Sequence, residues 1–263
     1  MKTLPFYQVD AFTDAIFKGN PAGVCPLNEW LSEEVMQKIA AENNLSETAF
    51  YVKKNGTYHI RWFTPTVEIP LCGHATLASA FVEFQNNNQL GDTIIFKNQT
   101  NQELPVIKKG NIIQLDFPAT ESTPMKIDDI HQKAFGHKPS EALNCGNMQL
   151  FVFDSEEIIK NMTPDLGIIS TFECVGVTVT AKGTETDIVC RMFAPQSGIN
   201  EDPVTGSAHT KLIPYWSKKL GKTNITSTQV SKRTGFLDCT FINNRVTMAG
   251  KAKLYLKGEI HLD

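Results

Sequence analysis

Hydrophobic and polar residues alternate along most of this chain, in short runs separated by turn residues. Alternation in runs rich in β-branched and aromatic residues is typical of β-strands. In the first half the pattern predicts strands at Phe6–Phe12, Thr48–Lys53, Tyr58–Phe63, Thr93–Lys97, Leu104–Lys108 and Ile112–Phe117. In the second half it predicts strands at Leu150–Phe153, Glu173–Thr180, Asp187–Phe193, Ile225–Val230, Phe236–Phe241, Arg245–Ala249 and Lys253–Ile260. Because the links are short, we expect antiparallel pairing.

Three segments carry a helical pattern instead. Ser32–Asn43 has one apolar face and starts with a serine that can cap it, which predicts a helix on the outside of a sheet. Ala75–Phe84 is apolar or small nearly all round, which predicts a helix enclosed by strands. Ala208–Lys219 is its counterpart in the second half, and Pro214 predicts a kink or a restart there.

One short passage occurs twice in the chain. Arg61-Trp62-Phe63-Thr64-Pro65 is followed by Cys72-Gly73-His74-Ala75, and Arg191-Met192-Phe193-Ala194-Pro195 is followed by Thr205-Gly206-Ser207-Ala208. The two arginines are 130 positions apart in a chain of 263 residues. The second copy is longer by three residues, which we place in the stretch that carries Asp202. The repeat predicts two similar halves.

These patterns together predict an α+β protein with two pseudo-symmetric halves. Each half is expected to be a curved antiparallel β-barrel-like sheet around one central helix. The predicted domains are residues 1–118 and 125–263, because the polar stretch from Pro118 to Pro124 has the composition of a linker.

Composition excludes several classes of protein. The net charge is −3, and the basic residues cluster only in pairs, which argues against nucleic-acid binding. No apolar run approaches the roughly 20 residues that span a bilayer, and the first residues lack the apolar core of a secretory signal. The six cysteines lie far apart without a C-x-x-C pair, which indicates reduced thiols and no zinc site. We therefore expect a soluble cytoplasmic protein.

Each copy of the repeat ends in a glycine that opens a helix. The start of a helix presents unpaired backbone N–H groups and the positive end of the helix dipole. Gly73 and Gly206 are thus predicted to bind a small-molecule carboxylate substrate, held between the two halves.

Four polar residues near these glycines are candidates for catalysis. Glu47 borders an apolar strand, where a carboxylate is suited to take and return a proton near neutral pH; as a plain alternative, it is a solvated loop residue. His74 can bind a ligand and change its charge, or it can be a buried structural histidine. Asp202 and Ser207 can serve as ligand contacts, or as a turn residue and a helix start.

Cys72 is weighed separately, because a thiol next to a helix start can be a nucleophile or a base. A racemase with two thiols would carry a second cysteine at the equivalent place, where this chain has Thr205. Cys72 therefore either works alone or is a small residue packed at a tight turn.

Four motifs in order resemble the phenazine-biosynthesis PhzF-like family: Asn20-Pro21-Ala22-Gly23-Val24-Cys25, Leu45 to Phe50, Phe63 to Thr76, and Glu201 to His209. That family is similar in fold to diaminopimelate epimerase. The resemblance implies a homodimer and an acid/base at Glu47, with His74, Asp202 and Ser207 as the other site residues. In the phenazine enzyme a glutamate isomerises trans-2,3-dihydro-3-hydroxyanthranilate, and that chemistry requires no cofactor and no metal.

The sequence thus predicts a cofactor-independent isomerase that moves a proton between carbons of a small carboxylate-bearing substrate. Two alternatives stay open. One is a cysteine-dependent amino-acid epimerase or racemase that uses Cys72, and the other is a non-catalytic protein that binds a small acid.

Overall fold

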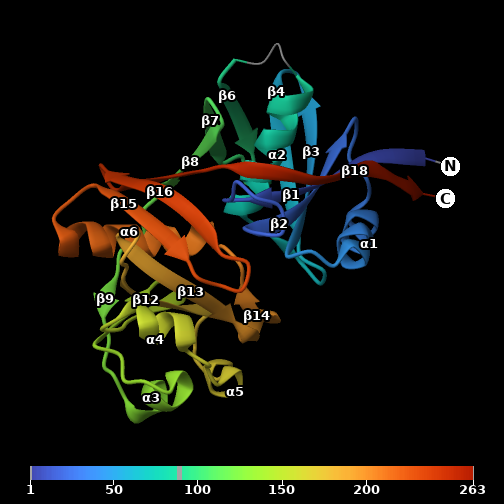
Figure 1. The fold of residues 1–263 in the computed structure, drawn as a ribbon. Helices are drawn as coiled ribbons and strands as arrows, with labels where there is room; N and C mark the ends of the chain where they lie inside the picture. Colours follow the sequence, from blue (N-terminus) through green and yellow to red (C-terminus); the bar gives the residue numbers. More distant parts are fainter. Residues whose placement is uncertain (1, 88–90, 263) are drawn as a thin grey trace. The chain divides into compact units, whose positions relative to one another are not determined.

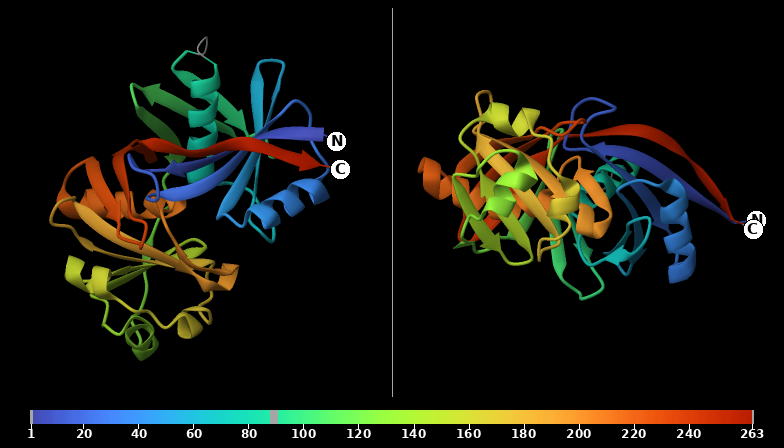
Figure 2. Two further views of the ribbon diagram at one scale, coloured as in Figure 1. Left: turned by 45° about the vertical axis from the view of Figure 1, so that its right-hand side comes forward. Right: turned by 90° about the horizontal axis from the view of Figure 1, so that it is seen from below.

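The structure is a computed structural model that describes residues 2–87 and 91–262. The chain divides into two compact units, residues 1–116 together with 249–263, and residues 117–248. The predicted boundary between 118 and 125 is close to the observed one, but the assignment of the C-terminal residues to the second half is wrong. The last strand pairs with the first along its length, with Lys2 opposite Leu262 and Ala11 opposite Ala252, so both ends of the chain belong to the first unit (Figure 2).

The first unit contains the helices α1 and α2 and half of the strands in the described chain (Figure 1). Its elements are β1 (Lys2–Ala11), β2 (Asn20–Leu27), α1 (Glu33–Asn43), β3 (Glu47–Lys54), β4 (Thr57–Phe63), β5 (Glu68–Ile69), α2 (Gly73–Asn86), β6 (Thr93–Lys97), β7 (Glu103–Lys109), most of β8 (Ile112–Pro118) and β18 (Ala252–Leu262).

The second unit has the same kinds of element and additional short helices. Its elements are β9 (Thr123–Pro124), α3 (Asp129–Phe135), β10 (Glu141–Cys145), β11 (Met148–Val152), α4 (Glu156–Asn161), α5 (Leu166–Ile169), β12 (Gly176–Lys182), β13 (Ile188–Ala194), the 3-10 turn η1 (Pro195–Ser197), β14 (Ile199–Asp202), α6 (Gly206–Leu220), β15 (Asn224–Gln229), β16 (Gly235–Ile242) and most of β17 (Arg245–Gly250).

The sheet is mixed, so the prediction of a purely antiparallel sheet is wrong. Strand β2 is parallel to β3, β4 to β6, β11 to β12, and β13 to β15. In each case one or two helices lie between the paired strands in sequence: α1, α2, α4 with α5, and α6. A parallel pair needs such a crossover, and the sequence pattern of the helices did not reveal what they connect.

Helix α2 is buried on almost every side, as its apolar composition predicts. Only scattered positions such as Glu83 are partly exposed, and the helix packs against β1, β2, β3 and β18. Helix α1 has a single buried face that includes Met36 and Ile39, which pack with Phe50 and Phe63 of the sheet. Its predicted cap is confirmed, since the backbone N–H of Val35 donates to the Ser32 hydroxyl. Helix α6 runs through Pro214 without the restart that we predicted.

The repeated arginines make the same interaction in each unit. Arg61 donates from Nε and Nη2 to the two oxygens of Glu68, and Arg191 does so to the two oxygens of Glu201. Each glutamate lies five residues before the glycine that opens a helix. The three extra residues therefore lie between Arg191 and Glu201, where the η1 turn is found, and not in the stretch that carries Asp202.

Candidate functional site

Strand β3 carries Glu47 to the start of helix α2. Side chains two apart on a strand share a face, so Glu47, Ala49 and Tyr51 point the same way. Tyr51 donates to Glu83 near the end of α2, while the Glu47 carboxylate lies 3.0 Å from His74 Nε2 near its beginning. The strand therefore runs along the helix, and its first residue lies at the first helix opening, which we define as Cys72, Gly73 and His74.

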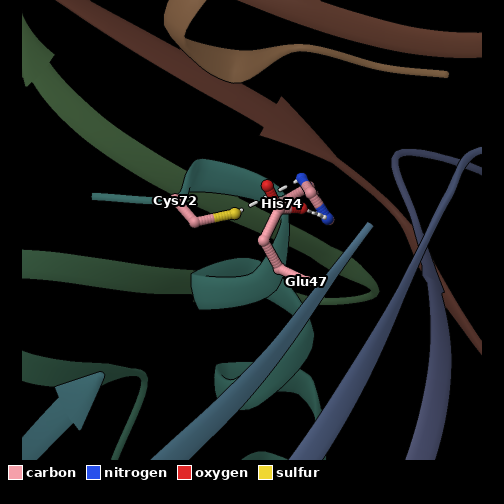
Figure 3. A group of neighbouring side chains, drawn as sticks. All are labelled: Glu47, Cys72 and His74. Carbon is pink, nitrogen blue, oxygen red and sulfur yellow. Dashed lines mark hydrogen bonds and ion pairs between the residues drawn. The ribbon is translucent and has the colours of Figure 1, made fainter. Parts of the chain in front are cut away.

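Three side chains form a chain of contacts at the first helix opening (Figure 3). His74 lies in the middle, with Nε2 toward Glu47 Oε2 at 3.0 Å and Nδ1 toward Cys72 Sγ at 3.5 Å. All three residues are buried, with at most 8% of their surface exposed. A carboxylate only accepts hydrogen bonds, so the facing nitrogen of His74 carries a proton. The structure thus brings together Glu47 and His74, two of the four predicted site residues.

Burial and neighbouring charges act in different directions on these groups. Burial lowers the pKa of His74, its interactions with Cys72 and Glu47 raise it, and the net pKa is well above the ordinary value. For Cys72, burial is the largest cause and raises the pKa of the thiol to about 11. The thiol therefore stays protonated at neutral pH, which opposes the reading of Cys72 as a ready nucleophile or base.

The same three side chains are the group in the described chain whose donor atoms could hold a metal ion. One atom each from Glu47, Cys72 and His74 lie within 4.8 Å of one another. Carboxylate, thiolate and imidazole are ligands that zinc accepts. However, His74 turns a different nitrogen toward each of the other two residues, so the three groups form a linear chain instead of converging on one point.

Two helices begin without a side-chain cap, in contrast to their neighbours. Ser155 caps α4 and Asp165 caps α5, each by accepting from a backbone N–H in the first turn. Neither Cys72 at the start of α2 nor Thr205 at the start of α6 makes such a bond. The backbone N–H groups at both openings are therefore not satisfied by a capping side chain, as an anion-binding role requires.

In the second unit, Asp202 is tied to the second helix opening, which we define as Thr205, Gly206 and Ser207. The Thr205 hydroxyl donates to Asp202 Oδ2. Gln229 on β15 donates to the backbone carbonyl of Asp202 at 2.7 Å and accepts from the backbone N–H of Thr205 at 2.9 Å. Asp202 and Gln229 are buried, whereas Ser207 is exposed. The structure thus places the other two predicted residues at one opening, with Ser207 directed away from the buried network.

His209 lies one turn further along α6 and is completely buried. Its Nδ1 lies 2.8 Å from the Thr205 carbonyl, which only accepts, so Nδ1 carries the proton. Its Nε2 accepts from the Ser227 hydroxyl at 2.9 Å. Burial lowers the pKa of His209 to about 4, so this histidine is neutral at neutral pH.

Sequence reasoning missed two residues that contact the predicted ones. Asn20 lies 3.2 Å from His74 Nδ1 through its amide nitrogen, and Gln229 joins Asp202 to Thr205. Both are fully buried. Each lies at the end of a strand, Asn20 at the start of β2 and Gln229 at the end of β15, and a buried amide has to find a hydrogen-bond partner.

Comparison with known proteins identifies the family. The family model described as "Phenazine biosynthesis-like protein" (PhzC-PhzF) matches residues 9–258. A Pseudomonas aeruginosa protein described as an uncharacterized isomerase is 46% identical over 259 residues, which cover 98% of this chain and 99% of that protein. A crystal structure of a phenazine biosynthesis protein of the PhzF family from Enterococcus faecalis is 49% identical, with a TM-score of 0.95 and coverage of 99% of this chain and 100% of that chain.

More distant structures share the fold alone. A hydroxyproline epimerase from Agrobacterium vitis is 8% identical and has a TM-score of 0.60 over 99% of this chain and 93% of its own. Among the described residues, none of the helices combines the length and apolar composition needed to cross a bilayer. With nearly the whole sequence matched by one family model, the chain belongs to the phenazine biosynthesis-like (PhzC-PhzF) family.

Proposed function

We propose that this protein is a cofactor-independent isomerase in which Glu47 moves a proton between two carbons of a small carboxylate-bearing substrate. The observation that carries the proposal is the buried Glu47–His74 pair beside the uncapped start of α2. The two relatives described above support the coarser part, because one is named an isomerase and the other a PhzF-family phenazine biosynthesis protein.

In the proposed reaction, the Glu47 carboxylate takes a proton from a carbon next to a conjugated system. The C–H bond breaks, an O–H bond forms on Glu47, and the electron pair enters the conjugated system. Glu47 then returns the proton to another carbon on the same face, so that nothing is oxidised or reduced. The His74 ring stays beside the carboxylate through both steps, since its Nε2 lies 3.0 Å from Oε2 and forms an ion pair with Glu47 when the ring is protonated.

Backbone N–H groups would hold the carboxylate of the substrate. Gly73 and His74 open α2 and lack a side-chain cap, and the same holds for Gly206 and Ser207 at α6. A helix start contributes about 0.3–1 kcal/mol to the binding of an anion, and more in buried surroundings. In this proposal Asp202 and Ser207 are further ligand contacts, and the chain forms homodimers.

We further propose that the two units are pseudo-symmetric copies of one ancestral half. Two observations support this. Arg61 binds Glu68 in the same way as Arg191 binds Glu201. The order of elements around the parallel pairs is also shared, since β4, α2 and β6 correspond to β13, α6 and β15.

The test is a comparison of Glu47→Gln with Glu42→Gln, an exposed carboxylate on α1. Each protein is incubated in D2O with trans-2,3-dihydro-3-hydroxyanthranilate and a panel of cyclic acids, and mass spectrometry follows deuterium uptake. We expect Glu47→Gln to lose isomerisation by about 10²–10⁴-fold while still binding the acid, and Glu42→Gln to match the wild type. Full turnover by folded Glu47→Gln would overturn the proposal.

The cysteine-dependent alternative rests on the contact between Cys72 Sγ and His74 Nδ1. It predicts the reverse outcome, loss of activity in Cys72→Ser and retention in Glu47→Gln. The non-catalytic alternative predicts that an acid raises the melting temperature of wild type and Glu47→Gln alike, with no deuterium uptake from either.

A further inference from the structure

Asn20 reaches the first helix opening from a different strand than Glu47. It is the first residue of β2, and its side chain is completely buried. On β2, Asn20 shares a face with Ala22, and Ala22 lies opposite Glu47 in the parallel pair of β2 and β3. The side chains of Asn20 and Glu47 therefore leave neighbouring strands on the same face, where α2 begins.

The imidazole ring of His74 lies between these two side chains. Glu47 Oε2 faces Nε2 at 3.0 Å, and the amide nitrogen of Asn20 faces Nδ1 at 3.2 Å. The thiol of Cys72 is a third neighbour, 3.5 Å from Nδ1. The two ring nitrogens thus have separate sets of neighbours, which hold the ring between Glu47 on one side and Asn20 and Cys72 on the other.

An amide differs from every charged side chain in what it offers Nδ1. Its NH2 group donates to an unprotonated Nδ1, and after a half-turn of the amide its oxygen accepts from a protonated Nδ1. Asn20 therefore gives Nδ1 a hydrogen bond in both charge states of His74, while Nε2 keeps its contact with Glu47. Of the titratable groups that contact His74 in the described chain, Glu47 on β3 faces Nε2, and the Cys72 thiol offers Nδ1 only a weak donor and a weak acceptor.

We infer that Asn20 is a positioning residue that holds the His74 ring with Nε2 against Glu47, whatever the charge of the ring. The kinetic consequence of this inference rests on the proposed function, but its structural consequence does not. In the proposed reaction, loss of Asn20 frees the ring to turn, so that Glu47 loses a fixed hydrogen-bond donor. The expected result is a fall in kcat on the order of 10–100-fold with little change in KM.

The structural consequence is tested by NMR of protein labelled with ¹⁵N in its six histidines. The variants are Asn20→Leu, which removes both hydrogen-bonding options, and Asn20→Asp, which keeps the shape and only accepts. Asn86→Leu is the matched control, since Asn86 is at the far end of α2 and donates to the Tyr7 hydroxyl. His74→Gln assigns the His74 resonances.

In the wild type and in Asn86→Leu we expect a slowly exchanging Nε2–H resonance from His74 at every pH between 6 and 9. Asn20→Leu should lose or broaden this resonance. Asn20→Asp should keep it and show an Nδ1–H resonance throughout the range, up to pH 9, which decides the matter if Asn20→Leu does not fold. An Nε2–H resonance unchanged in Asn20→Leu, or a missing Nδ1–H resonance in Asn20→Asp, would overturn the inference.

Failure of this inference is distinguishable from failure of the proposed function. The NMR measurement needs no substrate, so it stands even if Glu47→Gln proves active. Conversely, if the Asn20 variants leave the His74 resonances unchanged while Glu47→Gln is inactive, Asn20 has no positioning role and the proposed function is unaffected.

Discussion

The two helix openings share a backbone plan and differ in what their side chains can do. Before each opening an arginine donates two hydrogen bonds to a glutamate, and each opening starts a helix without a side-chain cap. At the first opening, His74 lies against a carboxylate, and its pKa is well above the ordinary value. At the second, His209 lies between a carbonyl and a hydroxyl, and burial lowers its pKa to about 4.

This difference lies in the neighbours of the two histidines. His74 forms a buried ion pair with Glu47 when the ring is protonated, whereas Thr205, Gln229 and His209 form a network of fixed donors and acceptors. The repeated backbone motif thus supplies two helix starts without a side-chain cap, and the side chains beside each start give the two openings different chemical properties.

The largest expected effect comes from making the first opening resemble the second. His74→Ser introduces a serine at the position that corresponds to Ser207 in the second opening. It removes the donor to Glu47, and we expect kcat/KM to fall by about 10²–10³-fold. Ser207→Ala is the matched change, and since Ser207 is exposed its loss should cost less than about tenfold. Equal losses in the two variants would break the comparison.

The next largest effect is a loss of stability on removal of the arginine–glutamate contact that precedes both openings. Arg191→Leu leaves the Glu201 carboxylate and the carbonyls of Ile159 and Met162 without their donor. Because the Arg191 side chain is only 13% exposed, we expect a loss of about 2–4 kcal/mol in the free energy of unfolding, measured by urea denaturation.

Lys38→Met provides the control for this change, because the Lys38–Glu34 pair is exposed on α1. Its loss should cost no more than about 0.5 kcal/mol. A similar loss in the free energy of unfolding in Arg191→Leu and Lys38→Met would show that the contact of Arg191 with Glu201 does not hold the second opening in place.

The pH dependence of stability sharpens the contrast between the two histidines. The folded-state pKa of His209 is about 4, below its ordinary value of 6.5, so between these values the unfolded chain binds the extra proton. Stability from His209 is therefore complete above about pH 6.5 and falls by about 3 kcal/mol as the pH drops toward 4. His74 has the opposite sign: its raised pKa stabilises the fold below pH 6.5, and this contribution is lost as the pH rises.

The measurement is urea denaturation at pH 4.5 to 7 of wild type and His209→Gln. The free energy of unfolding of His209→Gln should fall less steeply with decreasing pH than that of the wild type. The stability of the variant relative to the wild type therefore improves as the pH falls. Parallel curves would contradict the assignment of a buried, neutral His209.

The smallest expected effect is at Cys72. Its thiol is buried and its pKa is raised to about 11, so Cys72→Ser should change kcat/KM by less than about threefold. Iodoacetamide at pH 7 should leave Cys72 unmodified in the folded protein, as peptide mass spectrometry would reveal. Loss of activity on alkylation of Cys72 would instead favour a thiol-dependent epimerase.

Much of this architecture is readable from the sequence, because period-2 and period-3.6 patterns depend on burial alone. The enclosed helix at Ala75–Phe84 and the capped helix after Ser32 follow directly from residue type. Strand β2 was missed because Pro21, Gly23 and Pro26 interrupt its pattern, and proline normally argues against a strand that is paired on both sides, as β2 is with β1 and β3.

The site was only partly predictable for a related reason. Glu47 and His74 could be selected because each adjoins a recognisable motif, but their contact depends on the parallel register of β2 and β3 and on the packing of α2. The partners Asn20 and Gln229 are far from these residues in sequence, and only the folded chain brings them together. Strand pairing also explains why the C-terminal residues were assigned to the wrong half, since no local pattern shows that β18 pairs with β1.

The central claim is that Glu47 carries the proton, and deuterium uptake tests it most directly. A substrate that the wild type isomerises in D2O is incubated with Glu47→Gln, with ligand binding and folding checked separately. The account predicts a folded protein that binds the acid but neither isomerises it nor exchanges its carbon-bound protons. Isomerisation or exchange by Glu47→Gln at the wild-type rate would contradict it.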